Sequence, residues 1–73
     1  MKHQIQSVAQ MNGLLRELRK KSGLTAVQLA NRANVSTATV SYYENGQRGL
    51  RLEKLEALCK CMGHRIEILV IEE

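Results

Sequence analysis

Apolar residues recur at helical spacing along most of the chain. In the first third they lie three or four positions apart, at Val8, Met11, Leu15 and Leu18. This spacing predicts an amphipathic helix over about 8–21. Ser7 and Gln10 have the spacing of a capping box at its start, and Ser22-Gly23 ends it, because glycine readily adopts the left-handed conformation that closes helices.

Two short helices are predicted next, joined by a tight turn. Thr25 and Gln28 repeat the capping-box spacing and open a helix over about 26–32. Asn34 then stands where the turn needs a positive φ, and Ser36 caps a third helix that runs from Thr37 to about Asn45. The positions expected to be buried across 26–45 are Leu29, Ala30, Ala33, Val35, Val40 and Tyr43.

The last third combines a helix with a segment of different period. A fourth helix, ended by Gly63, is predicted from an apolar stripe at Leu52, Leu55, Leu58, Cys59 and Met62. Residues 64–71 are rich in β-branched residues and predict a strand. A lone strand is not stable, so it needs a partner, either residues 2–6 or the same segment of a second subunit. We favour the second, a two-stranded intermolecular ribbon that pairs Ile66, Ile68 and Val70.

Length and composition favour one small, mainly α-helical domain. The 73 residues allow a single domain over 1–73, and a monomer of this size is marginally stable, so stabilisation by disulfides, a metal or a second subunit is expected. The chain has no Pro, Trp or Phe, and its aromatic residues are Tyr42 and Tyr43, which suits Leu- and Ala-rich helices better than a β-sandwich. No signal peptide or membrane span is evident, so we expect a cytoplasmic protein without membrane contact.

Charge points to nucleic acid or an acidic surface as the partner. The net charge is +4, and residues 1–23 hold five bases against one acid. The spacing Cys59-x-Cys61-x-x-His64 offers three metal ligands without a fourth, so we expect no metal and a Cys59 that packs as a small hydrophobe. No nucleophile, base and orienting group occur together, and no phosphate loop occurs, so neither a cofactor nor an enzymatic activity is expected.

The two short capped helices form a helix-turn-helix over 26–45, whose second helix enters the major groove of DNA. A four-helix bundle without a DNA role predicts the same caps and core. It gives no reason for a helix that lacks acids on its outer face, and that face favours the DNA-binding interpretation.

Several runs carry a family resemblance that covers nearly all of residues 8–63. They are Leu24-Thr25-Ala26-Val27-Gln28-Leu29-Ala30, Val35-Ser36, Val40-Ser41, Tyr43-Glu44-Asn45-Gly46-Gln47-Arg48 and Leu52-Glu53-Lys54-Leu55. They resemble the Xre family of helix-turn-helix transcriptional repressors, related to the phage lambda repressor. The resemblance implies a four-helix DNA-binding domain over 8–63 that binds double-stranded DNA as a homodimer on a palindromic operator.

Within that family the chain is most similar to HipB-like antitoxins, on Thr37-Ala38-Thr39-Val40-Ser41 and Met62-Gly63-His64-Arg65-Ile66-Glu67-Ile68. This implies an antitoxin that represses its own operon and binds a HipA-like kinase toxin, with a dimerisation strand at 64–71. The alternatives are a stand-alone or phage-type repressor and a protein–protein adaptor. Three departures stand out: Ala26 replaces the usual Gln, Asn34 replaces the usual turn Gly, and the chain ends at Glu73 without the further tail of HipB.

Site residues follow from the helix faces and the resemblance. The residues expected to meet base edges are Thr37, Ala38, Ser41 and Tyr42. The residues expected to contact phosphates are Thr25, Ala26, Asn45, Gln47 and Arg48, with Lys21 and Arg51 as further candidates. The resemblance also implies a buried ion pair between Arg19 and Glu44, which links the first helix to the third.

Overall fold

The computed structural model describes residues 8–67 and 70–72, and it is mainly α-helical. Its four helices are α1 (Val8–Lys21), α2 (Ala26–Ala33), α3 (Thr37–Glu44) and α4 (Leu52–Cys61). Each begins or ends within about one residue of the range that the sequence predicts. None of the helices in this part of the chain is long and apolar enough to cross a membrane.

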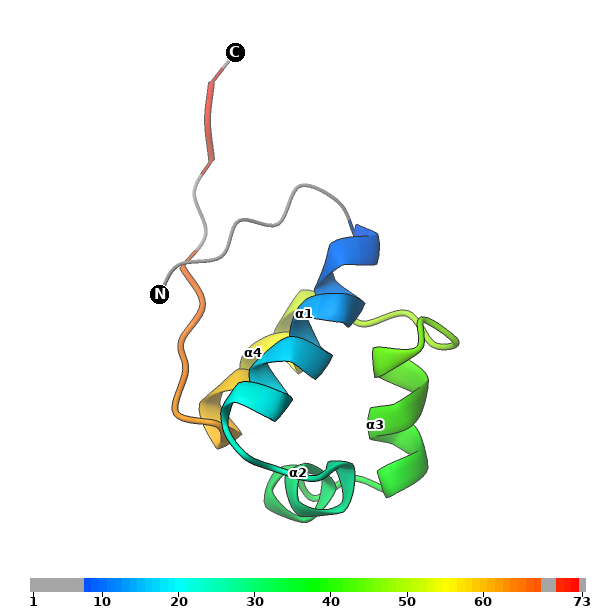
Figure 1. Ribbon diagram of the computed structural model, residues 1–73. Coiled ribbons are helices and arrows are strands. Elements are labelled where there is room, and N and C mark those ends of the chain that lie inside the picture. The colour runs from blue at the N-terminus through cyan, green and yellow to red at the C-terminus, as the bar shows by residue number, and fades with distance from the viewer. Residues whose placement is uncertain (1–7, 68–69, 73) are drawn as a thin grey trace.

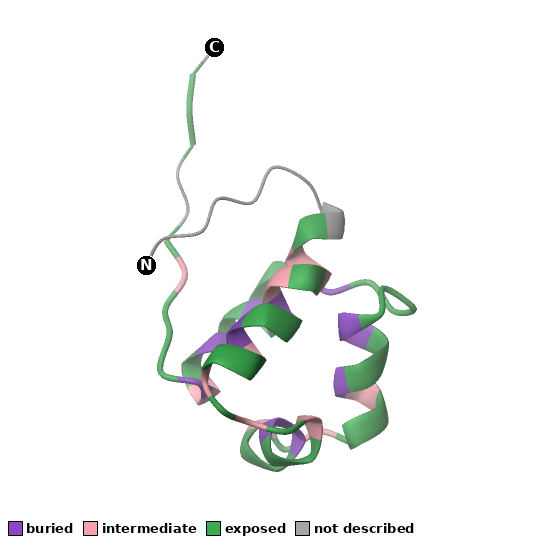
Figure 2. Ribbon diagram, viewed as in Figure 1, coloured by how far each residue is buried: buried purple, intermediate pink, exposed green. Residues whose placement is uncertain are grey.

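The four helices pack around one small core. α1 and α4 lie side by side, and α2 and α3 pack against each other and against this pair, α3 on α1 and α2 on α4 (Figure 1). The buried surfaces of all four helices face this centre, as Figure 2 shows. The apolar core consists of Leu15, Leu18, Leu29, Ala30, Val40, Tyr43, Leu50, Leu55, Leu58, Cys59 and Met62.

The ends of α2 and α3 confirm the local signals in the sequence. Thr25 Oγ1 accepts a hydrogen bond from Gln28 N at 3.1 Å, and Gln28 Oε1 accepts one from Thr25 N at 2.9 Å, so the capping box is complete. Asn34 ends α2 with φ 56°, and the side chain of Ser36 accepts from the amide of Thr39 at 3.0 Å to begin α3. The capping residue predicted for α1, Ser7, lies outside the described residues.

The predicted core of the helix-turn-helix is largely confirmed. Leu29, Ala30, Val40 and Tyr43 are buried, whereas Ala33 and Val35 are only partly buried and pack at its edge. Ala33 and Val35 flank the turn between the two helices, where solvent reaches the side chains on both sides of the chain reversal.

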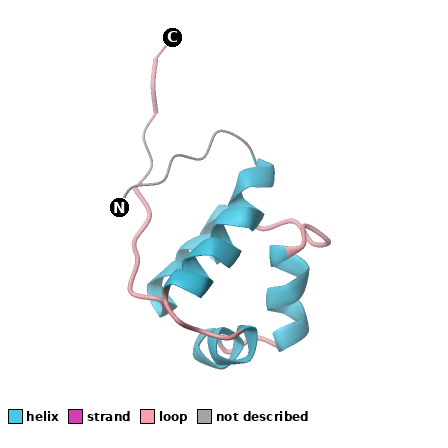
Figure 3. Ribbon diagram, viewed as in Figure 1, coloured by secondary structure: helices cyan, strands magenta, loops and turns pink. Residues whose placement is uncertain are grey.

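The strand predicted over 64–71 is absent from the described part of this segment. Residues 64–67 and 70–72 form no strand and lead away from the helices (Figure 3), with Val70 88% exposed and Ile66 partly buried against the core. Ile68 lies outside the described residues. Strand pairing requires a second backbone to accept and donate hydrogen bonds, and the segment has no such neighbour within the described residues of its own chain.

Both cysteines are free, and they occupy different environments. Cys59 is buried in the core, and this burial raises the pKa of its thiol. Cys61 is partly exposed, and its Sγ lies 3.6 Å from the carbonyl oxygen of Arg32. His64 Nδ1 is 3.0 Å from the carbonyl oxygen of Met62. No group of three or more metal-ligating side chains comes together in the part of the chain described.

The conformation of Asn34 yields a test of the turn. A β-branched residue is strained at φ 56°, so Asn34→Val is expected to lower the free energy of unfolding by about 1–2 kcal/mol, measured by urea denaturation. Asn34→Gly, which adopts this φ without strain, is the matched control and should stay within about 0.5 kcal/mol of the parent. Equal losses for the two variants would contradict a stability requirement for positive φ here.

Candidate nucleic-acid interface

One face of α3 is exposed and carries no charged side chain. It comprises Thr37, Ala38, Ser41 and Tyr42, and Asn45 continues it just beyond the end of the helix. Residues spaced one, four and five positions apart share one side of a helix, so the four predicted base-reading residues come together on a single surface. The face combines two hydroxyls, a methyl and a phenol, which can donate to, accept from or pack against base edges.

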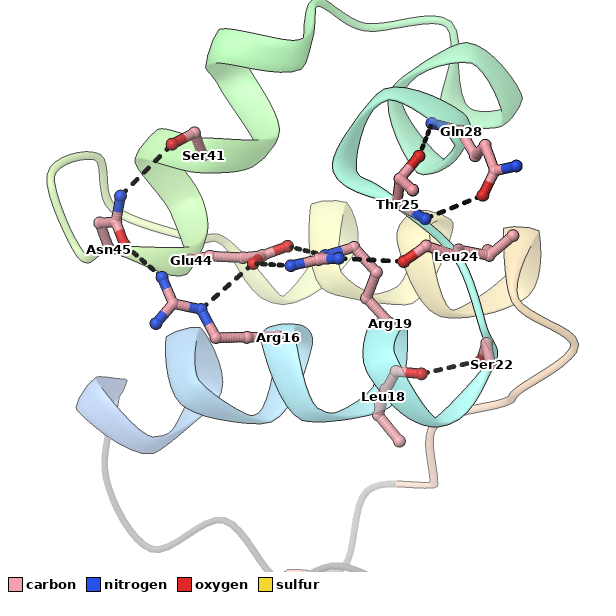
Figure 4. A network of polar contacts seen from close by, with 10 residues as sticks. All are labelled: Arg16, Leu18, Arg19, Ser22, Leu24, Thr25, Gln28, Ser41, Glu44 and Asn45. Atoms are coloured by element: carbon pink, nitrogen blue, oxygen red, sulfur yellow. Dashed lines mark hydrogen bonds and ion pairs between the residues drawn. The ribbon is translucent and has the colours of Figure 1, made fainter.

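Beside this face, the end of α3 is joined to α1 through a buried carboxylate. Glu44 is the last residue of the helix, and only 4% of its side chain is exposed. Arg19 of α1 meets it with two parallel hydrogen bonds, Nε to Oε2 at 2.7 Å and Nη2 to Oε1 at 3.0 Å (Figure 4). This bidentate geometry is the strongest arrangement of a guanidinium and a carboxylate, and it forms the ion pair that the family resemblance implies.

Arg19 is itself held on a second side. Its Nη1 donates to the carbonyl oxygen of Leu24 at 2.9 Å, in the segment between α1 and α2. The hydrogen bond to Glu44 raises the pKa of Arg19, and this effect outweighs the opposing effect of burial. A single guanidinium therefore connects α1, the approach to α2 and the end of α3.

A second arginine that the sequence analysis missed completes this network. Arg16 Nε lies 3.3 Å from Glu44 Oε1, and its Nη2 donates to Asn45 Oδ1. Arg16 precedes Arg19 by three residues and so lies on the same face of α1, which is the sequence signal that could have found it. Nearby, Asn12 Nδ2 donates to the carbonyl oxygen of Tyr43. The end of α3 is therefore bound to α1 both by the arginines and by Asn12, one turn earlier on α1.

Asn45 links this interior network to the exposed face. Besides accepting from Arg16, it donates from Nδ2 to Ser41 Oγ at 3.3 Å (Figure 4). Asn45 was predicted as a phosphate contact, and the structure shows both ends of its amide engaged within the protein. The second hydrogen on Nδ2 remains available to an outside acceptor.

The loop after α3 folds back over the helix. The backbone amides of Gln47 and Arg48 donate to the carbonyl oxygen of Tyr42 at 2.9 and 3.3 Å. The Arg48 guanidinium lies over the Tyr42 ring, 5.2 Å from its centroid, in cation–π geometry. Two residues predicted for different tasks, base contact and phosphate contact, are therefore neighbours.

The first turn of α2 presents backbone donors. The capping box engages the amides of Thr25 and Gln28, whereas Ala26 and Val27 occupy the first two helical positions, whose amides have no partner within a helix. The Thr25 hydroxyl accepts from Gln28 and keeps its own proton for an outside acceptor. This turn belongs to a different helix from the four residues of the α3 face.

The remaining basic candidates are solvent-exposed. Lys21 Nζ forms an ion pair with Glu17 Oε1 at 3.1 Å, four residues earlier on α1. Arg51 is exposed immediately before α4, and its side chain forms no capping hydrogen bond with that helix.

Comparison with protein families agrees with this arrangement. Residues 10–63 match the family model for a helix-turn-helix domain, which covers all but the start of α1 and all of α2, α3 and α4. The chain belongs to the helix-turn-helix domain family. Membership in this family implies DNA binding. No curated protein matches the chain in sequence.

The buried ion pair of this helix-turn-helix domain can be tested by a double-mutant cycle. Arg19→Met leaves the buried carboxylate with only the 3.3 Å contact to the half-exposed Arg16, and Glu44→Met strands the Arg19 guanidinium, so each is expected to cost about 3–5 kcal/mol of unfolding free energy. The double variant removes both charges and should be more stable than either single variant, measured by thermal and urea denaturation. A double variant that folds no better than the singles would contradict the pairing.

Proposed function

We propose that the protein is a sequence-specific DNA-binding transcriptional repressor that inserts α3 into the major groove. The observation that carries this proposal is the uncharged, exposed face of α3, held in place by the Glu44 network. An acid on this face would repel the phosphates on either side of the groove. The only acid of α3 is instead buried and paired with two arginines.

In this proposal four side chains read base edges. The Thr37 methyl and Ala38 suit the methyl group of thymine, and the hydroxyls of Ser41 and Tyr42 suit polar base edges. None of the four can form the bidentate contact of Arg to guanine or Gln to adenine. Direct readout is therefore modest, and DNA shape and bridging water carry much of the specificity.

Phosphate contacts supply most of the affinity and fix the orientation of α3. We assign them to the Thr25 hydroxyl and the Ala26 amide on one side, and to Asn45, Gln47 and Arg48 on the other. The stacking of Arg48 on Tyr42 supports this assignment, because a guanidinium already ordered loses less conformational entropy when it meets a phosphate.

A homodimer would present two recognition helices to a palindromic site. We propose that residues 64–71 pair across a two-fold axis, with Ile66, Ile68 and Val70 in a two-stranded ribbon. The exposure of Val70 and Ile71, at 88% and 73%, supports this, because a second subunit would remove that apolar surface from water.

The biological setting of such a repressor is inferred from the resemblance alone. A repressor acts on chromosomal DNA, which corresponds to the cytoplasmic location expected above. An antitoxin role with a HipA-like kinase partner stays a prediction of the similarity to HipB-like proteins.

Base reading can be tested on duplexes selected from a random-sequence pool by the full-length protein. Thr37→Ala and Tyr42→Phe should each weaken binding to the selected duplex about fivefold and leave binding to an unrelated duplex unchanged, measured by fluorescence anisotropy. Tyr42→Phe keeps the ring beneath Arg48, so it isolates the phenol.

Two charge variants serve as controls for this experiment. Arg48→Ala should weaken binding to both duplexes and flatten the slope of log K against log salt by about 1. Lys60→Ala, which removes an exposed charge near the end of α4, should leave both affinities unchanged. A parent protein that prefers no duplex over unrelated DNA would contradict sequence-specific binding.

The dimer can be tested by the solution mass of the intact chain beside one truncated after Gly63, using light scattering. The monomer is 8.2 kDa, and the intact chain should show twice that mass, whereas the truncated chain should be monomeric. Equal masses for the two chains, whether monomeric or dimeric, would rule out the ribbon as the dimer contact.

A further inference from the structure

We propose that Arg16 and Asn45 are positioning residues that make the Ser41 hydroxyl a hydrogen-bond donor toward a base acceptor in the major groove. The proposal rests on the function proposed above and names a determinant of its sequence preference. It extends the interface inward, to an arginine of α1 that lies outside the base-reading set.

The first step concerns which way the Asn45 amide points. An amide has an accepting end and a donating end, and only the accepting end can face a group that solely donates. Arg16 Nη2 is such a donor, and it contacts Asn45 Oδ1. The amino group of Asn45 must therefore face the other way, toward Ser41 Oγ at 3.3 Å.

Arg16 can impose this orientation because it is itself anchored. Its Nε lies 3.3 Å from Oε1 of Glu44, whose carboxylate is buried and also bound by Arg19. The Arg16 side chain is 46% exposed, so it reaches from this buried acid to the surface where Asn45 lies. The orientation of an exposed amide is thus fixed from the interior of the domain.

The second step concerns the Ser41 proton. Ser41 Oγ accepts from Asn45, so its own hydrogen must point elsewhere. A helical serine often donates to the carbonyl oxygen four residues earlier, as Ser22 does to Leu18 at 2.8 Å. Ser41 makes no such bond within the described residues, and its side chain lies on the exposed face. The hydroxyl hydrogen is therefore available to DNA.

This polarity has a specific chemical consequence for base recognition. In the major groove, N7 and O6 of guanine, N7 of adenine and O4 of thymine are acceptors, whereas the amino groups of cytosine and adenine are donors. Ser41 Oγ keeps one lone pair beside its hydrogen, but accepting from Asn45 polarises the hydroxyl, which strengthens it as a donor and weakens it as an acceptor. Ser41 therefore favours guanine or thymine over cytosine at the base it contacts, whereas a serine without this contact has no such bias.

The experiment compares sequence preferences of full-length variants selected on random-sequence duplexes. Ser41→Ala first identifies the base position that Ser41 reads, as the one position whose preference relaxes. Arg16→Met, which frees the Asn45 amide, should relax the same position about threefold to fivefold. Asn45→Ala should relax the preference at the same position, although it changes no residue of α1.

Asn45→Asp is the most informative variant because it reverses the direction of the hydrogen bond between residue 45 and Ser41. An aspartate still accepts from Arg16 but can only accept from Ser41, which turns the hydroxyl hydrogen inward and leaves lone pairs facing the groove. Preference at the Ser41 position should then move toward cytosine or adenine. The added negative charge should weaken binding to all duplexes by a common factor, which leaves the ratios between bases unaffected.

Arg48→Ala is the control, because it should lower the affinity for all sequences and leave the preference at the Ser41 position intact. Circular dichroism melting shows whether each variant is folded. The proposed positioning of Ser41 by Arg16 and Asn45 is contradicted if Ser41→Ala relaxes the base preference at no position. It is also contradicted if Ser41→Ala relaxes the preference at a position where Arg16→Met and Asn45→Asp leave it unchanged. If the parent protein enriches no sequence from the random pool, the proposed sequence-specific DNA binding is itself contradicted, and the positioning of Ser41 with it.

Discussion

A carboxylate buried at the end of α3 determines how the rest of this small domain is arranged. Glu44 is almost wholly enclosed, and a buried acid is tolerated only when its charge and lone pairs are satisfied. Arg19 and Arg16 supply these partners from α1, and Arg19 also binds the segment that leads into α2. Any rotation of α3 about its own axis would break the bidentate contact, so the direction in which its outer face points follows from an ion pair on its inner side.

This arrangement separates the charges that shape the protein from the groups that would meet DNA. The acid of α3 is buried and paired with Arg19 and Arg16, and the exposed face carries hydroxyls, a methyl and a phenol. In the proposed complex, attraction to the phosphates would come from the surrounding loops and helix ends, and this attraction acts over a longer range and without regard to sequence. A domain with a net charge of only +4 can in this way combine a general attraction with a neutral reading surface.

Much of this could be predicted from the sequence because the signals are local. The capping box at Thr25, the positive φ of Asn34 and the apolar periodicity each depend on residues within one or two turns, and each appears in the structure. The spacing from Arg19 could place Arg16 on the same face of α1, but the sequence does not show which distant group its long side chain reaches. The strand expected over 64–71 does not form in the described residues of the single chain for a related reason: β-branched composition indicates a tendency to extend, but strand formation depends on a partner backbone beyond the segment itself.

The brevity of α2 and α3 has a consequence for how the protein is controlled. Helices of eight residues do not persist alone in water, so each forms only when packed into the domain. α3 therefore depends on its packing against the core, and any opening that separates it from the core also removes its helical structure. The opened molecules that a protease can cleave are then also the molecules that have lost the proposed DNA-reading surface. DNA that binds this surface would lower the population of opened molecules and so slow proteolysis.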